Sequence, residues 1–436
     1  MSYNLCKWAF ACGFLGLSLQ AAEPPAIQPG KVSSITSAGT MNSGGYRGPN
    51  RNGIFPATSL LKKWPEDGPR LLWEPNIESG WTAASVADGR VYFCGGKGTM
   101  WAFTLDGKEL WKVAYGSEVT KNTGCRAGEP RGTPVVSEGL VYYESNSGVL
   151  HCLDGATGEK KWSADLNELG DTTPSVGVSA SPLIYRDLVI VVLRCKTNDD
   201  PPFVAFHKKT GKLAWKGSLG PCTTPGKTWS NFHQSPILVD TGLKKIVVCG
   251  FYRCVGAVDA DTGEKAWVMS WCDPAPKGEK TYNKVQPLFH EGYLFLCGSL
   301  MQKLQPDGTF KTLWEDKIKL GEYSISYCHT IISDRRLIAF TPGALKMLNA
   351  DTGDLIASVP CGKEGSVIMA DGMLYLFDNR PQVSLIEPTK DGLREVSSFK
   401  PAVSGKWLFT YPVISEGRLF LRHGRKIAVY DIRAIQ

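Results

Sequence analysis

Short apolar runs separated by tight turns recur along most of this chain. In residues 86–93, for example, Val-Ala and Arg-Val-Tyr-Phe flank Asp88 and Gly89. Apolar runs on both sides of a Gly-containing turn predict two antiparallel strands joined as a β-hairpin. Eight such hairpins follow one another, with their turns at Gly89, Gly139, Asp187, Gly242, Gly292, Asp334, Gly372 and Gly417.

A second hairpin follows most of these copies and has the form Asp-x-x-Thr-Gly-Glu-x-x-Trp. An Asp before the turn can hydrogen-bond its own backbone, and Gly accepts a positive φ, so the motif predicts a hairpin tip. The Trp starts the next strand, and we expect it to pack against the neighbouring repeat. Full, shortened or drifted copies occupy residues 105–111, 154–162, 207–215, 259–267, 306–314 and 349–355. The Trp residues expected to pack in this way are Trp73, Trp111, Trp162, Trp215, Trp267 and Trp314.

The spacing of the first hairpin sets the size of the repeat. Its turns lie between 38 residues apart, from Asp334 to Gly372, and 55 residues apart, from Asp187 to Gly242. Intervals of this size suit one four-stranded blade each, and no helical period of useful length stands between them. The sequence therefore predicts an all-β fold, an eight-bladed β-propeller of four-stranded antiparallel blades.

The two ends of the repeat array are complementary. The last copy supplies three strands, at residues 412–414, 418–421 and 426–430, and the chain then stops before a fourth. Residues 71–73 near the N-terminus form a Trp-containing strand without a blade of its own. Pairing the two would leave no unfinished blade edge, so we expect this N-terminal strand to close the ring.

The overall composition is typical of a folded β protein and limits the classes of partner that we expect. The chain has 436 residues, with 42% hydrophobic and 21% charged, and a net charge of +7 from 49 basic against 42 acidic side chains. These charges are scattered, which argues against a nucleic-acid partner and allows mild affinity for anions. We expect a monomer without a transmembrane segment.

The first residues read as an export signal. Lys7 precedes an apolar run over residues 8–19, and Gln-Ala-Ala-Glu follows it. That order matches a secretory signal, and the run is too short to span a bilayer. The expected organisation is a signal peptide at 1–22, a disordered leader at 23–45 and the propeller at 46–436. The expected location is the periplasm or the exterior.

Cysteine usage fits the same compartment without defining a disulfide framework. Removing the signal peptide leaves eleven of thirteen Cys residues. Several stand inside apolar strands, such as Cys94 and Cys297, where Cys behaves as a small buried hydrophobe. Cys249 and Cys254 flank a four-residue segment and could form a bridge across a hairpin, although nothing requires it.

The repeated motif resembles that of the pyrroloquinoline-quinone-like repeat propellers. This family includes quinoprotein alcohol dehydrogenases, non-catalytic relatives and the propeller lipoprotein of the outer-membrane protein assembly machinery. The leader Tyr-Arg-Gly-Pro-Asn-Arg-Asn-Gly at 46–53, with Trp64-Pro65 and Leu72-Trp73, is similar to that of a subgroup of exported bacterial propellers. The resemblance covers residue 46 to the end. It implies the fold, and a shared scaffold does not by itself imply an activity.

Two features separate this chain from the dehydrogenases. Resemblance to those enzymes would imply adjacent cysteines beside the quinone and an acidic and amide set that holds Ca²⁺ against it. This sequence has no Cys-Cys pair and no Cys-x-x-Cys-His haem motif. We assign no catalytic residue, no metal site and no cofactor, and pyrroloquinoline quinone with Ca²⁺ enters only with the enzyme hypothesis.

Candidate binding residues lie in the connectors that lead into the first strand of each blade. In a propeller these connectors converge around the central channel. Basic and aromatic side chains predominate there and would suit an anionic or carboxylate-bearing ligand. The alternative is a channel mouth filled by polar side chains and water. The predicted ligand-binding residues are Trp81, Arg131, Ser179, His233, Lys284, Tyr327, His329, Glu364, Phe409 and Tyr411.

Two hypotheses for function remain open at this point. The first is a non-catalytic binding or scaffold propeller of the cell envelope, with a protein, a glycan or a small anion as its partner. The second is an atypical quinone-dependent dehydrogenase. His233 and His329 are possible general bases for it, but the sequence supplies no nucleophile or carboxylate partner for either.

Overall fold

The structure is a computed structural model that describes residues 45–434 except 97, 116–128, 172–177, 222–228, 230–232, 252–253, 271–284, 319–328, 406–407 and 409. The chain divides into two units, residues 1–39 and 40–436. The expected signal peptide and all of the expected leader except Gly45 lie outside the described residues. No helix in the described part of the chain is long and apolar enough to cross a membrane.

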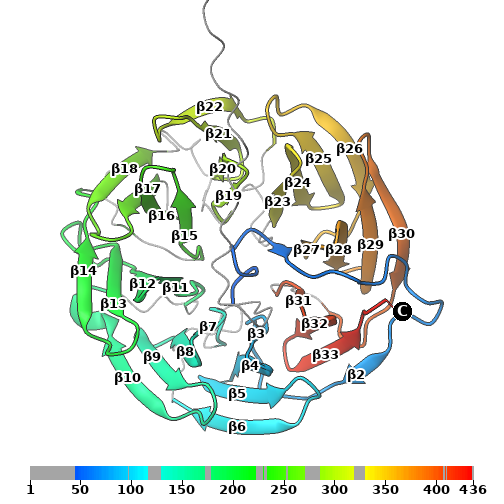
Figure 1. The fold of residues 1–436 in the computed structure, drawn as a ribbon, viewed down its shortest axis with the longest axis horizontal. Coiled ribbons are helices and arrows are strands. Elements are labelled where there is room, and N and C mark those ends of the chain that lie inside the picture. Colours follow the sequence, from blue (N-terminus) through cyan, green and yellow to red (C-terminus); the bar gives the residue numbers. More distant parts are fainter. Residues whose placement is uncertain are drawn as a thin grey trace, which may run out of the picture. The chain divides into compact units, whose positions relative to one another are not determined.

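The described residues form eight sheets arranged in a ring, antiparallel except for the β1–β27 pair, so the predicted eight-bladed β-propeller is confirmed (Figure 1). Blades 1 to 4 consist of β3 (Ser85–Ala87), β4 (Arg90–Gly95), β5 (Thr99–Thr104) and β6 (Glu109–Ala114); β7 (Val135–Ser137), β8 (Leu140–Glu144), β9 (Val149–Asp154) and β10 (Lys160–Asp165); β11 (Leu183–Tyr185), β12 (Leu188–Val192), β13 (Phe203–His207) and β14 (Leu213–Gly217); and β15 (Ile237–Asp240), β16 (Lys245–Gly250), β17 (Cys254–Asp259) and β18 (Lys265–Ser270).

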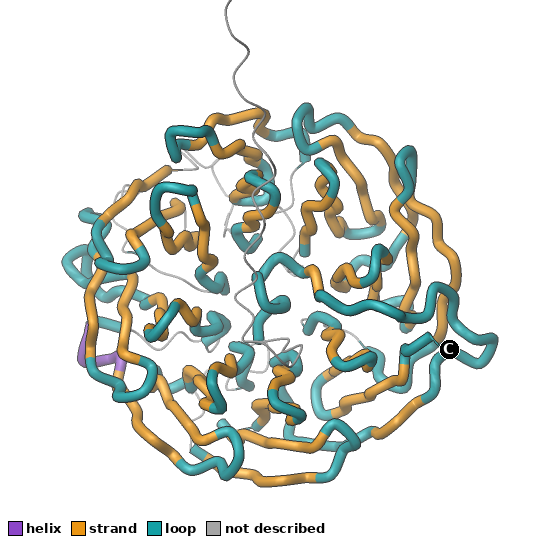
Figure 2. Tube along the Cα trace, viewed as in Figure 1, coloured by secondary structure: helices purple, strands orange, loops and turns teal. Residues whose placement is uncertain are grey.

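Blades 5 to 8 follow the same order from the channel outward. They consist of β19 (Leu288–His290), β20 (Tyr293–Leu296), β21 (Leu300–Leu304) and β22 (Phe310–Glu315); β23 (Thr330–Ser333), β24 (Arg336–Thr341), β25 (Ala344–Asn349) and β26 (Leu355–Pro360); β27 (Gly365–Ala370), β28 (Met373–Asp378), β29 (Gln382–Pro388) and β30 (Leu393–Phe399); and β31 (Val413–Ser415), β32 (Arg418–His423) and β33 (Lys426–Asp431). Two N-terminal strands, β1 (Ile54–Phe55) and β2 (Leu71–Trp73), add to blades 7 and 8. A 3-10 turn, η1 (Leu166–Leu169), follows β10 and is purple in Figure 2.

The inner hairpin of each blade has its turn at the predicted position. In blade 1 the turn residues Asp88 and Gly89 have φ values of 52° and 72°, and in blade 7 Asp371 and Gly372 have 49° and 75°. Positive φ at both central residues matches the right-handed twist of the strands on either side. The strands that follow are fully buried runs, as in β12, because each blade is covered on both faces by its neighbours.

The outer hairpin is the repeated Asp-x-x-Thr-Gly-Glu-x-x-Trp motif. Asp154 Oδ1 accepts hydrogen bonds from the backbone N–H groups of Ala156 and Thr157, at 2.9 and 3.0 Å, which forms the turn. The strand pairing then shifts by one residue before Trp162. Such a bulge re-aims the following side chain, and here the Trp162 indole N–H donates to Lys208 O of the next blade at 2.8 Å.

Blade 8 contains the N-terminal strand β2 at its outer edge. Leu71 lies opposite Tyr430 and Trp73 opposite Val429 in the antiparallel pairing with β33. Trp73 donates its indole N–H to Leu105 O of blade 1 at 2.8 Å, as Trp111, Trp162 and Trp314 do to carbonyl oxygens of their next blades. Whether the ring depends on this strand for its stability stays a prediction.

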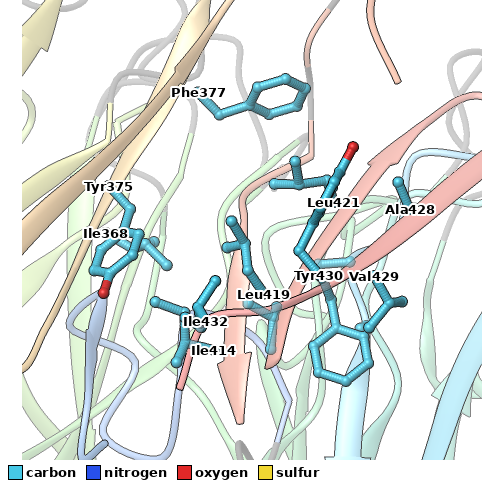
Figure 3. Packing of buried hydrophobic residues seen from close by; sticks show 14 of the residues in the cluster. Ile368, Tyr375, Phe377, Ile414, Leu419, Leu421, Ala428, Val429, Tyr430 and Ile432 are labelled. Atoms are coloured by element: carbon cyan, nitrogen blue, oxygen red, sulfur yellow. The ribbon is translucent and has the colours of Figure 1, made fainter. Parts of the chain in front are cut away.

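Apolar side chains fill the interface between blades 7 and 8 (Figure 3). Tyr375 and Phe377 of β28 face a group that includes Leu419 and Leu421 of β32, and all four are at most 1% exposed. Trp64 of the segment after β1 packs edge-on against Tyr375 and Phe399, with ring centroids 5.8 and 5.4 Å away. The N-terminal segment is therefore part of the core and not an appendage.

Cysteines within the described strands are buried, in agreement with their reading as small hydrophobes. The bridge that the spacing allowed between Cys249 and Cys254 is not formed. Cys249 lies opposite Gly256 in the β16–β17 ladder, and its thiol contacts the Gln234 and Gly250 carbonyl oxygens at 3.8 and 3.5 Å.

Candidate functional site: the central channel and its plug

The centre of the ring is occupied by the chain's own residues 45–55, here called the plug segment. In Figure 1 it is the dark blue stretch that reaches the middle of the ring before it runs outward past blade 7. Its last two residues form β1, which pairs in parallel with β27, so that Ile54 lies opposite Met369. The sequence pattern of 46–53 suggested a family leader, and nothing in it indicated that these residues enter the channel.

Turns inside the plug segment make it compact. The backbone N–H of Arg51 donates to Gly48 O at 3.1 Å, and that of Gly53 donates to Arg47 O at 3.0 Å. Arg47 and Arg51 have left-handed backbones, with φ values of 57° and 55°. Such conformations are uncommon outside Gly and persist where surrounding contacts over-determine them. The contacts of the two guanidinium groups supply that constraint.

Arg51 fastens the plug segment to blades 3 and 4. Its Nη1 donates to the carbonyl oxygens of Ser181 and Pro236, at 3.1 and 2.9 Å, and its Nη2 donates to Pro182 O. The side chain is 7% exposed. Burial lowers the pKa of Arg51 to about 10, with smaller opposing effects from Tyr411 and Tyr46. The guanidinium stays charged and is held by neutral carbonyl groups.

Arg47 and Asn52 extend the contacts to blades 5 and 6. Arg47 Nη2 donates to Thr330 O of β23. Asn52 Nδ2 lies 3.2 Å from His290 Nδ1 at the end of β19. Together with Arg51 and β1, these contacts place the plug segment against the innermost strands or connectors of blades 3 to 7.

A second set of contacts, here called the relay, links each of blades 1 to 4 to the next blade beside the channel. A backbone N–H in one blade donates to the side-chain oxygen of the residue two positions before the first strand of the following blade. The four pairs are Ala83 N to Thr133 Oγ1, Thr133 N to Ser181 Oγ, Ser181 N to Ser235 Oγ and Ser235 N to Gln286 Oε1, at 3.2, 2.9, 2.9 and 2.9 Å. Because buried N–H groups need acceptors, this relay fixes how blades 1 to 5 meet.

Predicted binding residues stand beside that relay, two positions earlier in the sequence. Ser179 Oγ and His233 Nδ1 are 3.2 Å apart, so the structure gives His233 a hydroxyl neighbour that the sequence did not reveal. The two residues hold equivalent positions in blades 3 and 4, and their side-chain contact joins the same two blades as the relay bond from Ser181 N to Ser235 Oγ. A serine hydroxyl in contact with a histidine is also the arrangement of a nucleophile and its general base.

Tyr411 and His329 lie together against the plug segment. The Tyr411 ring packs edge-on against Tyr46 and His329, with centroids 5.3 and 5.9 Å away, and its hydroxyl donates to Thr133 Oγ1 at 3.2 Å. Burial raises the pKa of Tyr411 to about 12. Burial, reinforced by the Arg47 charge, lowers the pKa of His329 well below its usual value, so the imidazole is neutral at pH 7. Tyr411 therefore contacts the chain's own N-terminal residues, and His329 packs against Tyr411 and interacts electrostatically with Arg47.

The other predicted residues are dispersed. Trp81 is 4% exposed, its ring lies edge-on to His423 with centroids 5.9 Å apart, and its backbone N–H donates to Pro130 O at 2.9 Å. Arg131 is half-buried in the connector before β7. The Glu364 carbonyl accepts from Asn379 N at 2.9 Å, in the connector before β27. Lys284, Tyr327 and Phe409 lie outside the described residues.

The repeat Trp residues pack on glycines of the next blade. A Cβ placed on Gly158, Gly211 or Gly263 would come within 2.6–2.8 Å of the ring of Trp111, Trp162 or Trp215, respectively. Trp314 is 5% exposed and donates its indole N–H to Ala350 O of blade 6 at 2.8 Å. Trp267 is half-buried against the apolar cluster of blades 4 and 5.

The channel offers a poor site for a quinone held by Ca²⁺. A calcium ion needs several carboxylate or amide oxygens around it. Among the described residues no three His, Cys, Asp or Glu side chains are grouped closely enough to hold a metal ion. The plug segment brings the buried guanidiniums of Arg47 and Arg51 into the channel, and these would repel a cation. The residues that the structure describes there do not fit the Ca²⁺–quinone pair.

Fold and repeats define this chain as an eight-bladed β-propeller with a plugged channel. A family model described as outer membrane protein assembly factor BamB matches residues 62–289, just over half of the chain. The chain belongs to this family of pyrroloquinoline-quinone-like repeat propellers.

Individual relatives come from both branches of the family. The outer membrane protein assembly factor BamB of Burkholderia pseudomallei is 23% identical over 309 residues, which cover 70% of this chain and 71% of that protein. The quinoprotein alcohol dehydrogenase PedH of Pseudomonas putida is 23% identical over 208 residues, which cover 48% of this chain and only 30% of the enzyme. The quinohemoprotein alcohol dehydrogenase of Comamonas testosteroni shares the fold, with a TM-score of 0.66 and 12% identity over 91% of this chain and 81% of that one.

Proposed function

We propose that this protein is an exported, non-catalytic propeller that acts as a binding scaffold for another protein in the cell envelope. The plug segment is the main support for this proposal. It fills the channel with two guanidinium groups, and it leaves His329 and Tyr411 packed within the chain itself. An enzyme of this architecture would need that space for its substrate and cofactor. A protein partner needs only the faces and rim of the ring.

The pattern of similarity supports the same role. The assembly factor aligns over most of its own length as well as over most of this chain, whereas the dehydrogenase aligns over less than a third of its length. The expected signal peptide at residues 1–22 would bring the propeller to the envelope. A glycan or a small anion bound at the channel mouth has less support. The plug segment already packs against part of the aromatic and basic set that was predicted to hold such a ligand.

The test is reciprocal capture from the native envelope. The full chain with a C-terminal tag is expressed from its own signal sequence, cross-linked in intact cells and purified under denaturing conditions. We expect one envelope protein to be enriched in near-stoichiometric amount, and the same complex to be recovered when that partner carries the tag. A chain lacking residues 1–22 serves as the control, because it should stay inside the cell and lose the partner. Recovery of the exported protein alone would contradict the proposal.

A quinone-dependent dehydrogenase is the second candidate, favoured by the alignment to PedH over nearly half of the chain. The purified protein is incubated with pyrroloquinoline quinone and Ca²⁺, and bound quinone is sought by its absorbance after gel filtration. Dye reduction with primary alcohols is then measured. A bound quinone spectrum together with alcohol-dependent dye reduction would replace the scaffold proposal with an enzymatic one.

A further inference from the structure

Arg47 is buried in the channel with most of its hydrogen-bonding capacity unused. The residue is 1% exposed, and its Nη2 donates to Thr330 O. Its Nε and Nη1 have no hydrogen-bond acceptor in the structure as described. Guanidinium groups that are buried so completely are normally satisfied at every nitrogen, because water cannot compensate them.

Two neighbouring residues also contain buried polar atoms without hydrogen-bond partners among the described residues. His329 and Thr330 are 4% and 0% exposed, and neither His329 Nδ1 nor Thr330 Oγ1 has a hydrogen-bond partner within the described part of the chain. They are consecutive, and the Thr330 carbonyl is the group that Arg47 contacts. Four polar atoms without partners therefore belong to Arg47, to Thr330, whose carbonyl Arg47 contacts, and to His329, which precedes Thr330 and interacts electrostatically with Arg47.

Within the described residues, no carboxylate compensates the charge of Arg47. The groups that interact electrostatically with it are Tyr46 and Tyr411, and those that interact with Arg51 are Tyr411, Tyr46 and Cys249. None of these is a carboxylate. By contrast, buried Arg194 between blades 2 and 3 contacts both Glu144 and Asp171. A buried cation without a counter-charge is strongly unfavourable, so the comparison marks the Arg47 site as incomplete.

A bound water could supply hydrogen bonds to these atoms but would leave the charge unbalanced. A small anion does both, since it accepts from a guanidinium, a hydroxyl and an imidazole N–H at once. A divalent or bulky anion fits less well, because a single guanidinium faces it and the surroundings are tightly packed. Gly53 shows how little room there is, since a Cβ at this position would lie 2.8 Å from Arg47 Nη2.

We propose that a small monovalent anion, a halide or a planar oxyanion such as nitrate or bicarbonate, binds between Arg47 of the plug segment and His329 and Thr330 of blade 6. The anion would neutralise Arg47 and tie the plug segment to blade 6. This site is independent of the scaffold role, and it would stand if the protein proved to have another function.

Thermal unfolding of the full chain in matched salts tests the site. Protein prepared in sodium gluconate is titrated with sodium bromide or sodium nitrate at constant ionic strength. Since a ligand that binds only the folded state stabilises it by mass action, we expect a saturable rise of the midpoint with each probe. A midpoint that does not rise relative to gluconate, or that changes linearly without saturation, would overturn the proposal.

Matched variants separate the site from general salt effects. Arg47→Met should abolish the bromide-dependent rise, and Thr330→Val should weaken it. Arg51→Met is the control, because the Arg51 guanidinium is already bound by three carbonyl oxygens. It should lower the midpoint in gluconate but keep the bromide increment. An equal bromide increment in Arg47→Met and in the unchanged protein would count against the site.

Diffraction locates the anion directly and covers the case in which Arg47→Met fails to fold. Crystals of the unchanged protein grown with sodium bromide are measured at the bromine absorption edge. We expect an anomalous peak within hydrogen-bonding distance of Arg47 and His329. Water alone at this position would show a hydration site only. A bromide peak without any effect on the unfolding midpoint would show binding at crystal concentration only. Either result rejects the proposal.

Discussion

Arg422 of blade 8 donates a 2.6 Å hydrogen bond from Nη1 to Thr82 Oγ1 of blade 1, across the junction where the two ends of the repeat array meet. The same nitrogen also donates to Cys94 O at 2.6 Å, and Nη2 donates to Glu78 O at 3.2 Å. Arg422 is 2% exposed, and burial lowers its pKa to about 10. One side chain of blade 8 therefore binds both β4 and the segment that precedes β3 in blade 1.

Replacing Arg422 should weaken ring closure. We expect Arg422→Met to lower the free energy of unfolding by about 2 kcal/mol, because several charge-assisted hydrogen bonds are lost inside the protein. Arg422→Lys should lower the free energy of unfolding by nearly as much, since an ammonium group cannot reproduce the forked set of N–H donors of a guanidinium. Urea-induced unfolding followed by tryptophan fluorescence measures both.

Asp106→Asn is the control for that measurement. It breaks another charged contact between the same two blades, the 3.1 Å pair of Asp106 with Arg418, but the Asp106 side chain is 88% exposed. An exposed pair contributes about 0–1 kcal/mol, so the variant should unfold almost like the unchanged protein. Equal losses in Arg422→Met and Asp106→Asn would show that Arg422 has no special role in closure.

The Trp-on-Gly contact predicts a difference between two turn glycines. Gly139 and Gly211 have φ values of 73° and 69°, so Ala at either position incurs a left-handed backbone penalty of about 1–2 kcal/mol. A Cβ on Gly139 would meet nothing within 4 Å, whereas one on Gly211 would lie 2.6 Å from the Trp162 ring. We expect Gly211→Ala to cost about 1–3 kcal/mol more than Gly139→Ala, through overpacking.

A double-mutant cycle identifies the origin of that difference. In a Trp162→Ala background the ring is absent, so Gly211→Ala should cost no more than Gly139→Ala. Chemical denaturation of the set of variants provides the comparison. If the excess cost of Gly211→Ala persisted without the indole, the contact between blades would not be its cause.

Features encoded by neighbouring residues could be predicted from the sequence. The inner-hairpin turns were found because left-handed turn positions select Gly, Asp and Asn, and each stands between two apolar strands. The outer hairpin was found because Asp154, its Gly and Trp162 act within one motif. The Trp contact with the next blade followed from its regular place in the repeat.

The plug segment could not be predicted in the same way. Its decisive contacts join Arg51 to Pro236 and Arg47 to Thr330, residues separated by 185 and 283 positions. Single polar contacts of this range leave no periodic pattern in a sequence. Of the predicted channel residues, Tyr411 packs against Tyr46 of the plug segment, and His329 interacts electrostatically with Arg47. Two arginines within five residues of a Gly-rich leader were the only available signal.

A truncation series separates the role of the plug segment from that of β2. Chains beginning at residue 45, 57 or 77 contain both elements, β2 alone, or neither. We expect the chain from 57 to fold with a lower thermal midpoint, because the channel contacts of Arg47 and Arg51 are missing. The chain from 77 should lose cooperative unfolding, since β33 becomes an unpaired edge and Trp73 no longer packs on Gly107. Calorimetry distinguishes these outcomes, and similar unfolding of the chains from 57 and 77 would show that β2 does not close the ring.

His151 predicts a pH dependence with a defined sign. It lies in β9, is 7% exposed and packs against Tyr115 with ring centroids 5.0 Å apart. Burial, with a smaller effect of Lys160, lowers its pKa from 6.5 to about 4. The folded state thus binds a proton less readily than the unfolded state, so the stability contributed by neutral His151 is present above pH 6.5 and is lost as the pH falls towards about 4. The loss should approach about 1.4 kcal/mol per pH unit.

The variant His151→Gln isolates this effect from the other buried groups. His329 contributes in the same direction, whereas burial raises the pKa of Glu144 to about 7, which increases stability as the pH falls from 7 towards 4.5. These contributions are common to both proteins, so the difference in unfolding free energy between them reports His151 alone. At pH 7.5 that difference contains only lost packing and hydrogen bonding. Urea denaturation at pH 7.5, 6.0 and 5.0 should show the unchanged protein losing stability relative to His151→Gln as the pH falls. A constant difference at all three values would mean that His151 has the same pKa in the folded and unfolded states.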